Sequence, residues 1–439
     1  MSTLSFDDLV TIFHQRLDSL PDHRKGKNKQ YSIKDAALGG FSVFFTQSPS
    51  FLDHQRTMKQ TKGHSNAETM FRIEQIPCDN QIRSLLDPLA PHELYPVFGK
   101  VFDILEEAGQ IELFRTMAGQ LLVTLDGTNY FSSKALQCGN CSQRTTTTGE
   151  TIYFHTAVTP VLVTPGRNQV ISLEPEFITP QDGHDKQDCE RVAAKRWIEQ
   201  HASHYSPKRV TLLGDDLYSN QPLCQLAIDV GFNFIFVCKP ESHAILYEWL
   251  AYLAANHDID ELSVHHWNGR FTEIARYRYA NDLPLRGGAD ALIVHWCEVS
   301  VTNGSTGEVL YYNTYVTNHR LTEQTVVPIV KAGRARWKVE NENNNVLKTK
   351  GYHLEHNFGH GSQYLASFLL TLNLLAFLFH TVLDLLDAKY HLLRQALATR
   401  QTFFNDVRTL TRYLCFRSWQ HLMDFMITQL ELQPKLNTS

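Results

Sequence analysis

The sequence predicts a mixed α/β fold, and three observations lead to it. The first hundred residues carry apolar side chains at helical spacing. From about residue 121, β-branched apolar runs alternate with helical segments, and residues 259–322 hold strand patterns separated by turn signals. We therefore expect a helical N-terminal domain, an α/β core with a β-rich insertion, and a helical tail.

Residues 1–118 are expected to form the helical N-terminal domain. Apolar residues every three to four positions predict helices at 7–20 and 33–48, and one or two more at 92–118. The polar stretch 56–66 lies between them and is expected to be a basic connector.

The core is expected in two parts, 119–258 and 323–388, divided by the insertion at 259–322 and followed by a helical tail at 389–439. β-Branched and aromatic runs predict the strands, and apolar faces at helical spacing predict the helices. The expected strands lie at 121–126, 151–164, 170–173, 209–214 and 232–238, and the expected helices at 188–201 and 221–230.

The apolar segment 365–379 resembles a membrane span in composition. It has about 15 residues, whereas a bilayer needs about 20, and Asn373 lies inside it. We expect a buried core helix and no membrane association. The start of the chain lacks the basic and apolar regions of a signal peptide, so we expect a cytoplasmic protein whose eight cysteines are reduced.

The bulk charge does not indicate a dedicated DNA-binding protein, because the formal net charge of the 439 residues is −5. Basic residues nevertheless gather at 23–34 and at 331–350. Either stretch could contact phosphates. The alternative is that both are solvated charged surfaces.

Three acidic residues occupy places where a metal site could be built. Asp126 ends the apolar run 121–125, Asp215 ends the run 210–214, and Glu340 lies in a predicted helix. Their oxygen ligands suit Mg²⁺ or Mn²⁺ rather than Zn²⁺. Two such ions about 4 Å apart can hold the oxygens of an in-line phosphoryl displacement. The acids predict an enzyme that cuts nucleic acid, and the alternative is three unrelated surface acids.

In the order and spacing of these motifs, the chain resembles the DDE transposases of the bacterial insertion-sequence-4-like superfamily. The resemblance covers roughly residues 120–380 and implies an RNase H-like catalytic core. It rests on Leu125-Asp126-Gly127-Thr128, on Gly214-Asp215-Asp216-Leu217-Tyr218-Ser219, and on Arg336-Trp337-Lys338-Val339-Glu340-Asn341.

The resemblance gives the three acids their roles. Asp126 is expected to bridge two metal ions, and Asp215 and Glu340 to hold one each. The second acid of the family begins an Asp-x-x-aromatic pattern, which Asp215 fits. Asp216 remains the alternative.

The third family motif, Tyr-x2-Arg-x3-Glu-x6-Lys, is only partly present. Arg336 and Glu340 match in spacing, Gly333 stands at the Tyr position, and Lys348 falls one residue late. Arg336 and Lys348 are expected to neutralise the phosphate. The missing Tyr leaves open whether excision passes through a DNA hairpin.

The resemblance implies a DNA transposase that binds the terminal inverted repeats of its own element through the N-terminal domain. It would cleave the ends of double-stranded DNA and join them to a target, with Mg²⁺ or Mn²⁺, as a homodimer. A plain metal-dependent nuclease and a catalytically silent DNA-binding protein are the alternatives.

Several weaker DNA contacts are suggested by position. Trp267 and Trp296 are candidates for stacking on a flipped base, with packing in a sheet core as the alternative. His319 ends a strand shortly before the Glu340 segment, and Arg334 and Lys338 flank Arg336. These three side chains could contact the DNA backbone.

Cys138 and Cys141 have the spacing of metal ligands. Further ligands would come from His155, His184 or Cys189. A structural Zn²⁺ clip is one interpretation, and a turn with free, reduced thiols is the other.

The histidines His353, His356 and His360 form another group, which we expect to contact phosphate or to pack at a helix end rather than bind metal. Further acids could compete as metal ligands: Glu174, Glu176, Asp182 and Asp185. No apolar strand leads directly to 182 or 185, so they rank below the three acids above.

Overall fold

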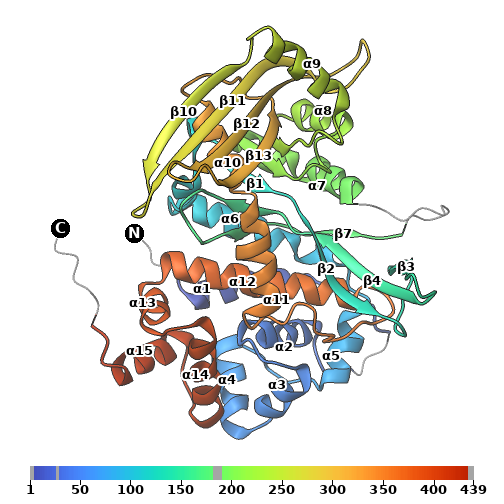
Figure 1. The fold of residues 1–439 in the computed structure, drawn as a ribbon. Helices are drawn as coiled ribbons and strands as arrows, with labels where there is room; N and C mark the ends of the chain where they lie inside the picture. Colours follow the sequence, from blue (N-terminus) through green and yellow to red (C-terminus); the bar gives the residue numbers. More distant parts are fainter. Residues whose placement is uncertain (1–3, 26–28, 181–189, 434–439) are drawn as a thin grey trace.

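A large mixed sheet and a body of helices make up the protein (Figure 1), and the mixed α/β class expected from the sequence is confirmed. The computed structural model describes residues 4–25, 29–180 and 190–433. The sheet lies on one side of the molecule, and helices from both ends of the chain gather on the other. β1, β8 and β9 are parallel, whereas the other neighbours in the sheet are antiparallel. In spatial order the nine strands are β10 (Asp260–Trp267), β11 (Thr272–Pro284), β12 (Ile293–Asn303), β13 (Val309–Thr317), β9 (Asn233–Val237), β8 (Val210–Gly214), β1 (Leu121–Thr124), β5 (Val161–Val163) and β6 (Ile171–Ser172).

The strands expected as a β-rich insertion extend the sheet of the core. β10 to β13 form an antiparallel series, and β13 pairs with β9 through Val316 opposite Phe236. The insertion therefore continues the sheet instead of forming a separate layer (Figure 1).

A second, smaller sheet projects from the core and is formed by β2 (Gly127–Ser133), β4 (Thr151–Val158), β3 (Ser142–Thr145) and β7 (Glu176–Ile178). The single strand expected at 151–164 is divided at Pro160, so that β4 lies in the small sheet and β5 in the large one. Proline has no N–H for the ladder, which explains the break.

Helices pack against the strands of both sheets. α8 and α10 contact β9, α9 contacts β11, and α7 contacts β4 and β7. Their bounds are α7 (Glu190–Tyr205), α8 (Gln221–Asp229), α9 (Ala244–Ala255), α10 (Val326–Arg334), the π-helical turn η5 (Val339–Asn344), and α11 (Asn345–Thr349), with the 3₁₀ turn η4 (Ser206–Lys208).

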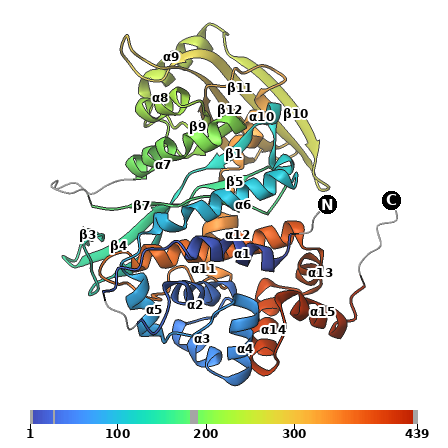
Figure 2. The same ribbon diagram turned by 180° about the vertical axis from the view of Figure 1, so that it is seen from behind.

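The helical body is built around α12 (Leu365–Leu386). This helix is long and apolar enough to cross a membrane, but 83% of its most apolar window is buried inside the protein, as expected for a core helix. α1 and α2 pack on it, and α6 lies alongside α1 and α12 (Figure 2). The N-terminal helices are α1 (Phe6–Leu17), α2 (Ile33–Phe45), α3 (Phe51–Met58), α4 (Thr61–Phe71), α5 (Asp79–Leu86) and α6 (Tyr95–Glu107), with 3₁₀ turns η1 (Pro91–Leu94), η2 (Ile111–Phe114) and η3 (Met117–Gly119). The C-terminal helices are α13 (Ala388–Ala396), α14 (Arg400–Tyr413) and α15 (Trp419–Gln429).

The polar stretch 56–66 is helical, which corrects its expected role as a connector. It spans the end of α3 and most of α4. The two helices approach closely at Gly63, where an added Cβ would lie 2.2 Å from the Thr57 carbonyl oxygen. Buried Asn66 donates to the carbonyls of Thr411 (2.6 Å) and Leu414 (2.7 Å), so the tail joins the N-terminal helices.

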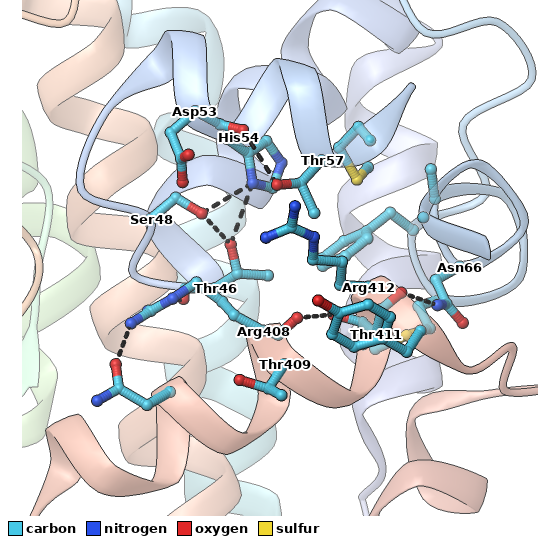
Figure 3. Close-up of a pocket in the computed structure, with 17 residues that line it drawn as sticks. Thr46, Ser48, Asp53, His54, Thr57, Asn66, Arg408, Thr409, Thr411 and Arg412 are labelled. Atoms are coloured by element: carbon cyan, nitrogen blue, oxygen red, sulfur yellow. Dashed lines mark hydrogen bonds between the residues drawn. The ribbon is translucent and has the colours of Figure 1, made fainter. Parts of the chain in front are cut away.

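A cavity of about 320 Å³ lies between α3, α4 and α14 (Figure 3). His54 is buried beside it and shares hydrogen bonds with the hydroxyls of Ser42 and Ser48, each at 2.9 Å. Burial lowers the pKa of His54 to about 3, and the nearby Arg408 guanidinium adds to the decrease. His54 is therefore neutral in the folded protein.

Acidification is expected to destabilise the protein through His54. Its folded pKa is about 3 against an ordinary 6.5, so the unfolded state binds more protons between these values and stability falls as the pH falls below about 6.5. Between about pH 7.5 and about pH 5.5, this residue should remove about 1.4 kcal/mol of unfolding free energy. Other histidines whose pKa is lowered by burial, such as His319, contribute in the same direction. Urea denaturation at both pH values should therefore show a loss about 1.4 kcal/mol smaller in His54→Gln than in the wild type.

His64→Gln is the control for this measurement, because His64 is an exposed histidine on α4. Its pH dependence should match the wild type. An unchanged pH dependence in His54→Gln would contradict the buried, neutral state.

Candidate active site

The first two predicted acids lie next to each other at one edge of the sheet. β1 and β8 are parallel, with Thr124 opposite Leu213, and the Leu125 N–H donates to the Leu213 carbonyl at 3.0 Å. Continuing this register two residues places Asp126 beside Asp215. Both follow the carboxyl ends of their strands, where an open α/β sheet presents its ligands.

The segment that carries Glu340 is fastened to the first acid. Asn344 lies in the same π-helical turn, η5, and its amide donates to Asp126 Oδ2 at 3.1 Å. Asn344 Oδ1 accepts from the Thr159 hydroxyl at 3.0 Å and from the Asn343 side-chain amide at 2.9 Å. These bonds connect η5 to the end of β1 and to the chain between β4 and β5. π-Helical turns are frequent at functional sites.

Negative charge accumulates around Asp126. Burial, which has the largest effect, and the carboxylates of Glu190 and Glu340 together raise the pKa of its carboxyl to about 7. Arg336 opposes the increase, and Asp215 adds to it. A buried carboxyl whose pKa is raised by neighbouring carboxylates favours a bound cation, because a cation would offset the repulsion between these groups.

Among the described residues, the three acids do not meet in one tight group. Only the cysteine and histidine cluster described below brings three or more candidate ligand atoms within 4.8 Å of one another. Glu340 is exposed and its carboxylate accepts from Arg336 at 3.1 Å. The donor types suit Mg²⁺ or Mn²⁺, and acids spread in this way suit a pair of ions better than one small ion.

Glu190 is an acid of this site that the sequence analysis did not identify. It begins α7, and its Oε1 accepts from the Gly127 N–H at 3.0 Å and from the Tyr218 hydroxyl at 2.6 Å. An added Cβ at Gly127 would lie 2.3 Å from Glu190 Oε2, so a side chain there would displace the Glu190 carboxylate. An acid at a helix start is a common capping residue, and the sequence held no further signal.

Asp215 and Asp216 have different surroundings. Asp216 accepts from the Lys239 N–H at 2.7 Å and from the Ser242 hydroxyl, and thus holds the loop that follows β9. Among the hydrogen bonds of the described residues, the Asp215 carboxylate accepts only that from the Leu217 N–H, at 2.8 Å. The arrangement favours Asp215 as the acid that is free to bind a ligand.

The two predicted phosphate-binding cations are both engaged in ion pairs. Arg336 pairs with Glu340, four residues further along the chain, because side chains at this spacing lie on the same face of a helix. Lys348 pairs with Glu355 at 2.9 Å. At the position where the family has Tyr, Gly333 faces the Tyr315 ring, which an added Cβ would approach to 2.8 Å. A side chain at 333 would have no space.

Two of the predicted DNA contacts are corrected by burial. Trp296 is 2% exposed and packs in the sheet core, so it has no face to offer a base. Lys338 is 4% exposed, and its ammonium donates to the Arg167 carbonyl. Lys338 faces inward because it follows α10, where the chain turns toward η5.

The other three predicted contacts differ in exposure. Trp267 is 62% exposed at the end of β10, and Arg334 is exposed with its guanidinium 4.1 Å from the centre of the Tyr311 ring. His319 is half-buried, with Nε2 3.0 Å from the Thr211 hydroxyl. Burial lowers the pKa of His319 to about 4, so it carries no charge for a phosphate at neutral pH.

The N-terminal basic stretch is largely neutralised by acids. Arg24 and Lys29 both pair with Asp22 at 2.9 Å, and Lys34 pairs with Asp18 at 2.8 Å. The segment 26–28 lies outside the described residues. Surface pairs of this kind add little stability, but they reduce the positive field of this stretch.

A cysteine and histidine cluster lies at the far end of the small sheet. Cys138 and Cys141 occupy the turn after β2, His155 lies in β4, and His360 comes from the loop before α12. Their ligand atoms lie within 4.8 Å of one another, so the cluster could hold a metal ion. Burial alone would raise the pKa of the Cys138 thiol, but hydrogen bonds with His155 and His360 lower it to about 5.

This cluster changes the expectation for one histidine. His360, expected to contact phosphate or to pack at a helix end, lies with the cysteines, while His356 stays exposed. His184 and Cys189, the other ligands considered, lie outside the described residues, as do Asp182 and Asp185. Glu174 and Glu176 are buried and bonded within the fold, Glu174 to the Tyr205 hydroxyl and Glu176 to Arg196.

No family model matches the chain, and a search of curated proteins finds no significant match. The argument for function therefore rests on the residues and their geometry.

Asn344→Ala is expected to destabilise the protein and to release η5 from Asp126. The substitution leaves the buried partners Thr159 and Asn343 without their acceptor, which costs about 1–3 kcal/mol of unfolding free energy. Urea denaturation measures this loss. Asn345→Ala is the matched control, because Asn345 is exposed one position further along; equal losses in the two variants would contradict the role of the Asn344 network.

Proposed function

We propose that this protein is a DDE-type DNA transposase that cleaves and joins DNA at the ends of its insertion sequence. The observation that carries the proposal is the meeting of Asp126 and Asp215 at the ends of adjacent parallel strands, with the Glu340 turn fastened to Asp126. The mixed sheet is compatible with an RNase H-like core. It supports the family resemblance without depending on a sequence match.

The donor set fits divalent ions that prefer oxygen. Asp126 and Asp215 offer carboxylates from rigid strand ends, and Glu340 offers a third from an exposed turn. When bound, Mg²⁺ or Mn²⁺ ions would activate water or a DNA 3′-hydroxyl and stabilise the leaving oxygen. The cysteine and histidine cluster would hold a separate, structural Zn²⁺ ion that takes no part in this chemistry.

The protein's own residues orient these ligands. Asn344 fixes the Asp126 carboxylate, and Glu190 fixes the backbone at Gly127 directly after it. Arg336 holds the Glu340 carboxylate now. If Glu340 turns toward a cation, Arg336 gains a free guanidinium to neutralise a phosphate.

Exposed basic and aromatic side chains beside the acids support DNA as the substrate. Lys331, Arg334 and Lys350 are exposed around η5, and Trp337 is 42% exposed. They outline the surface on which double-stranded DNA would lie. Action on two element ends requires two active sites, so we propose a homodimer in the cytoplasm, with no membrane partner.

Asp126→Asn and Asp215→Asn are expected to reduce DNA cleavage by about two to three orders of magnitude, the effect of losing one group that stabilises developing charge. The assay uses the purified full chain, Mg²⁺ or Mn²⁺, and a plasmid carrying the open reading frame with its native flanks. Breaks are mapped by sequencing, and joined products are detected by amplification across new junctions. Breaks at the element ends, with joined products, are the expected result.

Asp229→Asn is the control, because it makes the same change on the far end of α8. It should cleave like the wild type. Scattered breaks without joining would indicate a plain nuclease, and tight binding to the flanks without breaks would indicate a silent DNA-binding protein. Full cleavage by Asp126→Asn would contradict the site assignment.

Arg334→Gln is expected to weaken binding to all DNA sequences alike. Loss of one phosphate contact should reduce the slope of log affinity against log salt by about 0.9. Fluorescence anisotropy over a salt series measures that slope. Lys389→Gln is the control, because Lys389 lies on α13 in an ion pair with Asp424; an unchanged slope in Arg334→Gln would exclude this residue from the interface.

A further inference from the structure

We infer that Cys138, Cys141, His155 and His360 form a tetrahedral zinc site that fastens the small sheet to the loop before α12. The inference does not rest on the proposed function, because none of the four residues belongs to the acidic site. It concerns a structural ion with four protein ligands.

The distances between the ligand atoms have the size of a zinc tetrahedron. With Zn–S bonds of about 2.3 Å and Zn–N bonds of about 2.0–2.1 Å, an ideal site separates two sulfurs by about 3.8 Å, sulfur from nitrogen by about 3.5 Å, and two nitrogens by about 3.3 Å. The two Sγ atoms lie 3.8 Å apart and the two Nε2 atoms 3.2 Å apart. Sulfur to nitrogen distances are 3.5 Å for Cys138–His155, 3.4 Å for Cys141–His155 and 3.3 Å for Cys141–His360.

The donor chemistry selects the same ion. Two thiolates and two imidazoles suit Zn²⁺ and do not suit the oxygen-preferring Mg²⁺ or Ca²⁺. Cys141, His155 and His360 are buried. The two Nε2 atoms face each other at 3.2 Å, where one would have to donate to the other in the absence of an ion, whereas one cation satisfies the lone pairs of all four ligand atoms at once.

Hydrogen bonds and ring packing hold the four ligand residues in position without the ion. The Cys141 N–H donates to the Cys138 carbonyl at 3.2 Å, and the Cys138 N–H donates to Cys141 Sγ at 3.4 Å, which forms a tight turn. The Tyr130 ring stacks on the His155 ring at 5.6 Å, and the Phe131 ring lies 4.4 Å from that of His360. The ligands are thus held by packing.

The loop that carries His360 is also held from its other side. Asp87, directly after α5, accepts from the N–H groups of Gln363 at 3.0 Å and Leu365 at 3.1 Å. The Asn140 amide donates to the Gln363 carbonyl at 2.7 Å, which joins this loop to the cysteine turn. The ion would close this connection across 205 residues, from His155 to His360.

The position of the site explains what the ion would stabilise. β2 begins at Gly127, the residue after Asp126, and the His360 loop follows the turn that carries Glu340. Zinc at the far end of β2 would therefore connect two segments. One is the strand that begins directly after Asp126, and the other is the loop that follows the Glu340 turn. Without it, the small sheet would rest on the core with fewer restraints.

The experiment begins with the full chain purified without added chelator. Elemental analysis should find one zinc ion per chain, and the cobalt-exchanged protein should show the visible absorption of a tetrahedral site with thiolate ligands. Cys141→Ser and His360→Gln should each reduce zinc to background. Two control variants should keep the wild-type zinc content. Cys415→Ser changes an exposed cysteine outside the cluster, and His356→Gln changes an exposed histidine in the loop that carries His360.

A second measurement uses the wild type alone and so does not depend on the folding of a variant. Chelator treatment should expose the cysteine turn and β3 to limited proteolysis, and zinc should restore protection while Mg²⁺ should not. A protein with a Cys138–Cys141 disulfide and no zinc, a zinc content at background, or full zinc in Cys141→Ser would overturn the inference. Because none of these readouts involves DNA, they are independent of any failure in the cleavage assay.

Discussion

The parallel pairing of β1 with β8 sets where the acidic side chains lie. Its register puts Asp126 and Asp215 at equivalent positions after two adjacent strands. A slip of one residue would turn one carboxylate to the opposite face of the sheet. The pairing is secured by apolar side chains buried on both faces, since every residue of β1 and β8 is buried. The position of the acidic side chains thus depends on the packing of two strands that are buried from solvent.

Charge crowding at this edge has a structural cost, and the surrounding residues offset part of it. Burial and neighbouring acids raise the pKa of Asp126, while Arg336 and the Asn344 amide favour its carboxylate. Glu190 adds negative charge but also holds Gly127 and Tyr218. Sites with a function commonly keep such unfavourable arrangements, because a bound ligand resolves them.

The helical body gives the active-site elements a fixed base. α12 is buried along its length, and helices from both ends of the chain pack around it (Figures 1 and 2). Asn66 joins α4 to the tail, and Asp87 holds the start of α12. The loop with His360 is therefore fixed to the helical body through Asp87.

Local pattern alone predicted much of the framework. Apolar spacing gave the helices of α1, α2 and α8 and the strands β8 and β9 within a few residues, because burial of one face depends on the residue types along that element. The buried state of α12 was expected from an apolar run of about 15 residues and from the polar Asn373 within it. The helix has 22 residues and is long enough to cross a membrane, so of these two indications only Asn373 holds. The order of the two strand-end acids also followed, because each acid ends its own apolar run.

What the sequence by itself determined is therefore the type of each element and the residue types that it carries. The tertiary structure decided which side chains meet. His360 joins cysteines more than 200 positions earlier, Glu190 reaches the turn after β1, and Lys338 and Trp296 point inward. Such contacts depend on how elements from distant parts of the chain pack together. Local sequence patterns do not contain this information, so the place of His360 beside the cysteines and that of Glu190 beside Asp126 could be identified only from the fold.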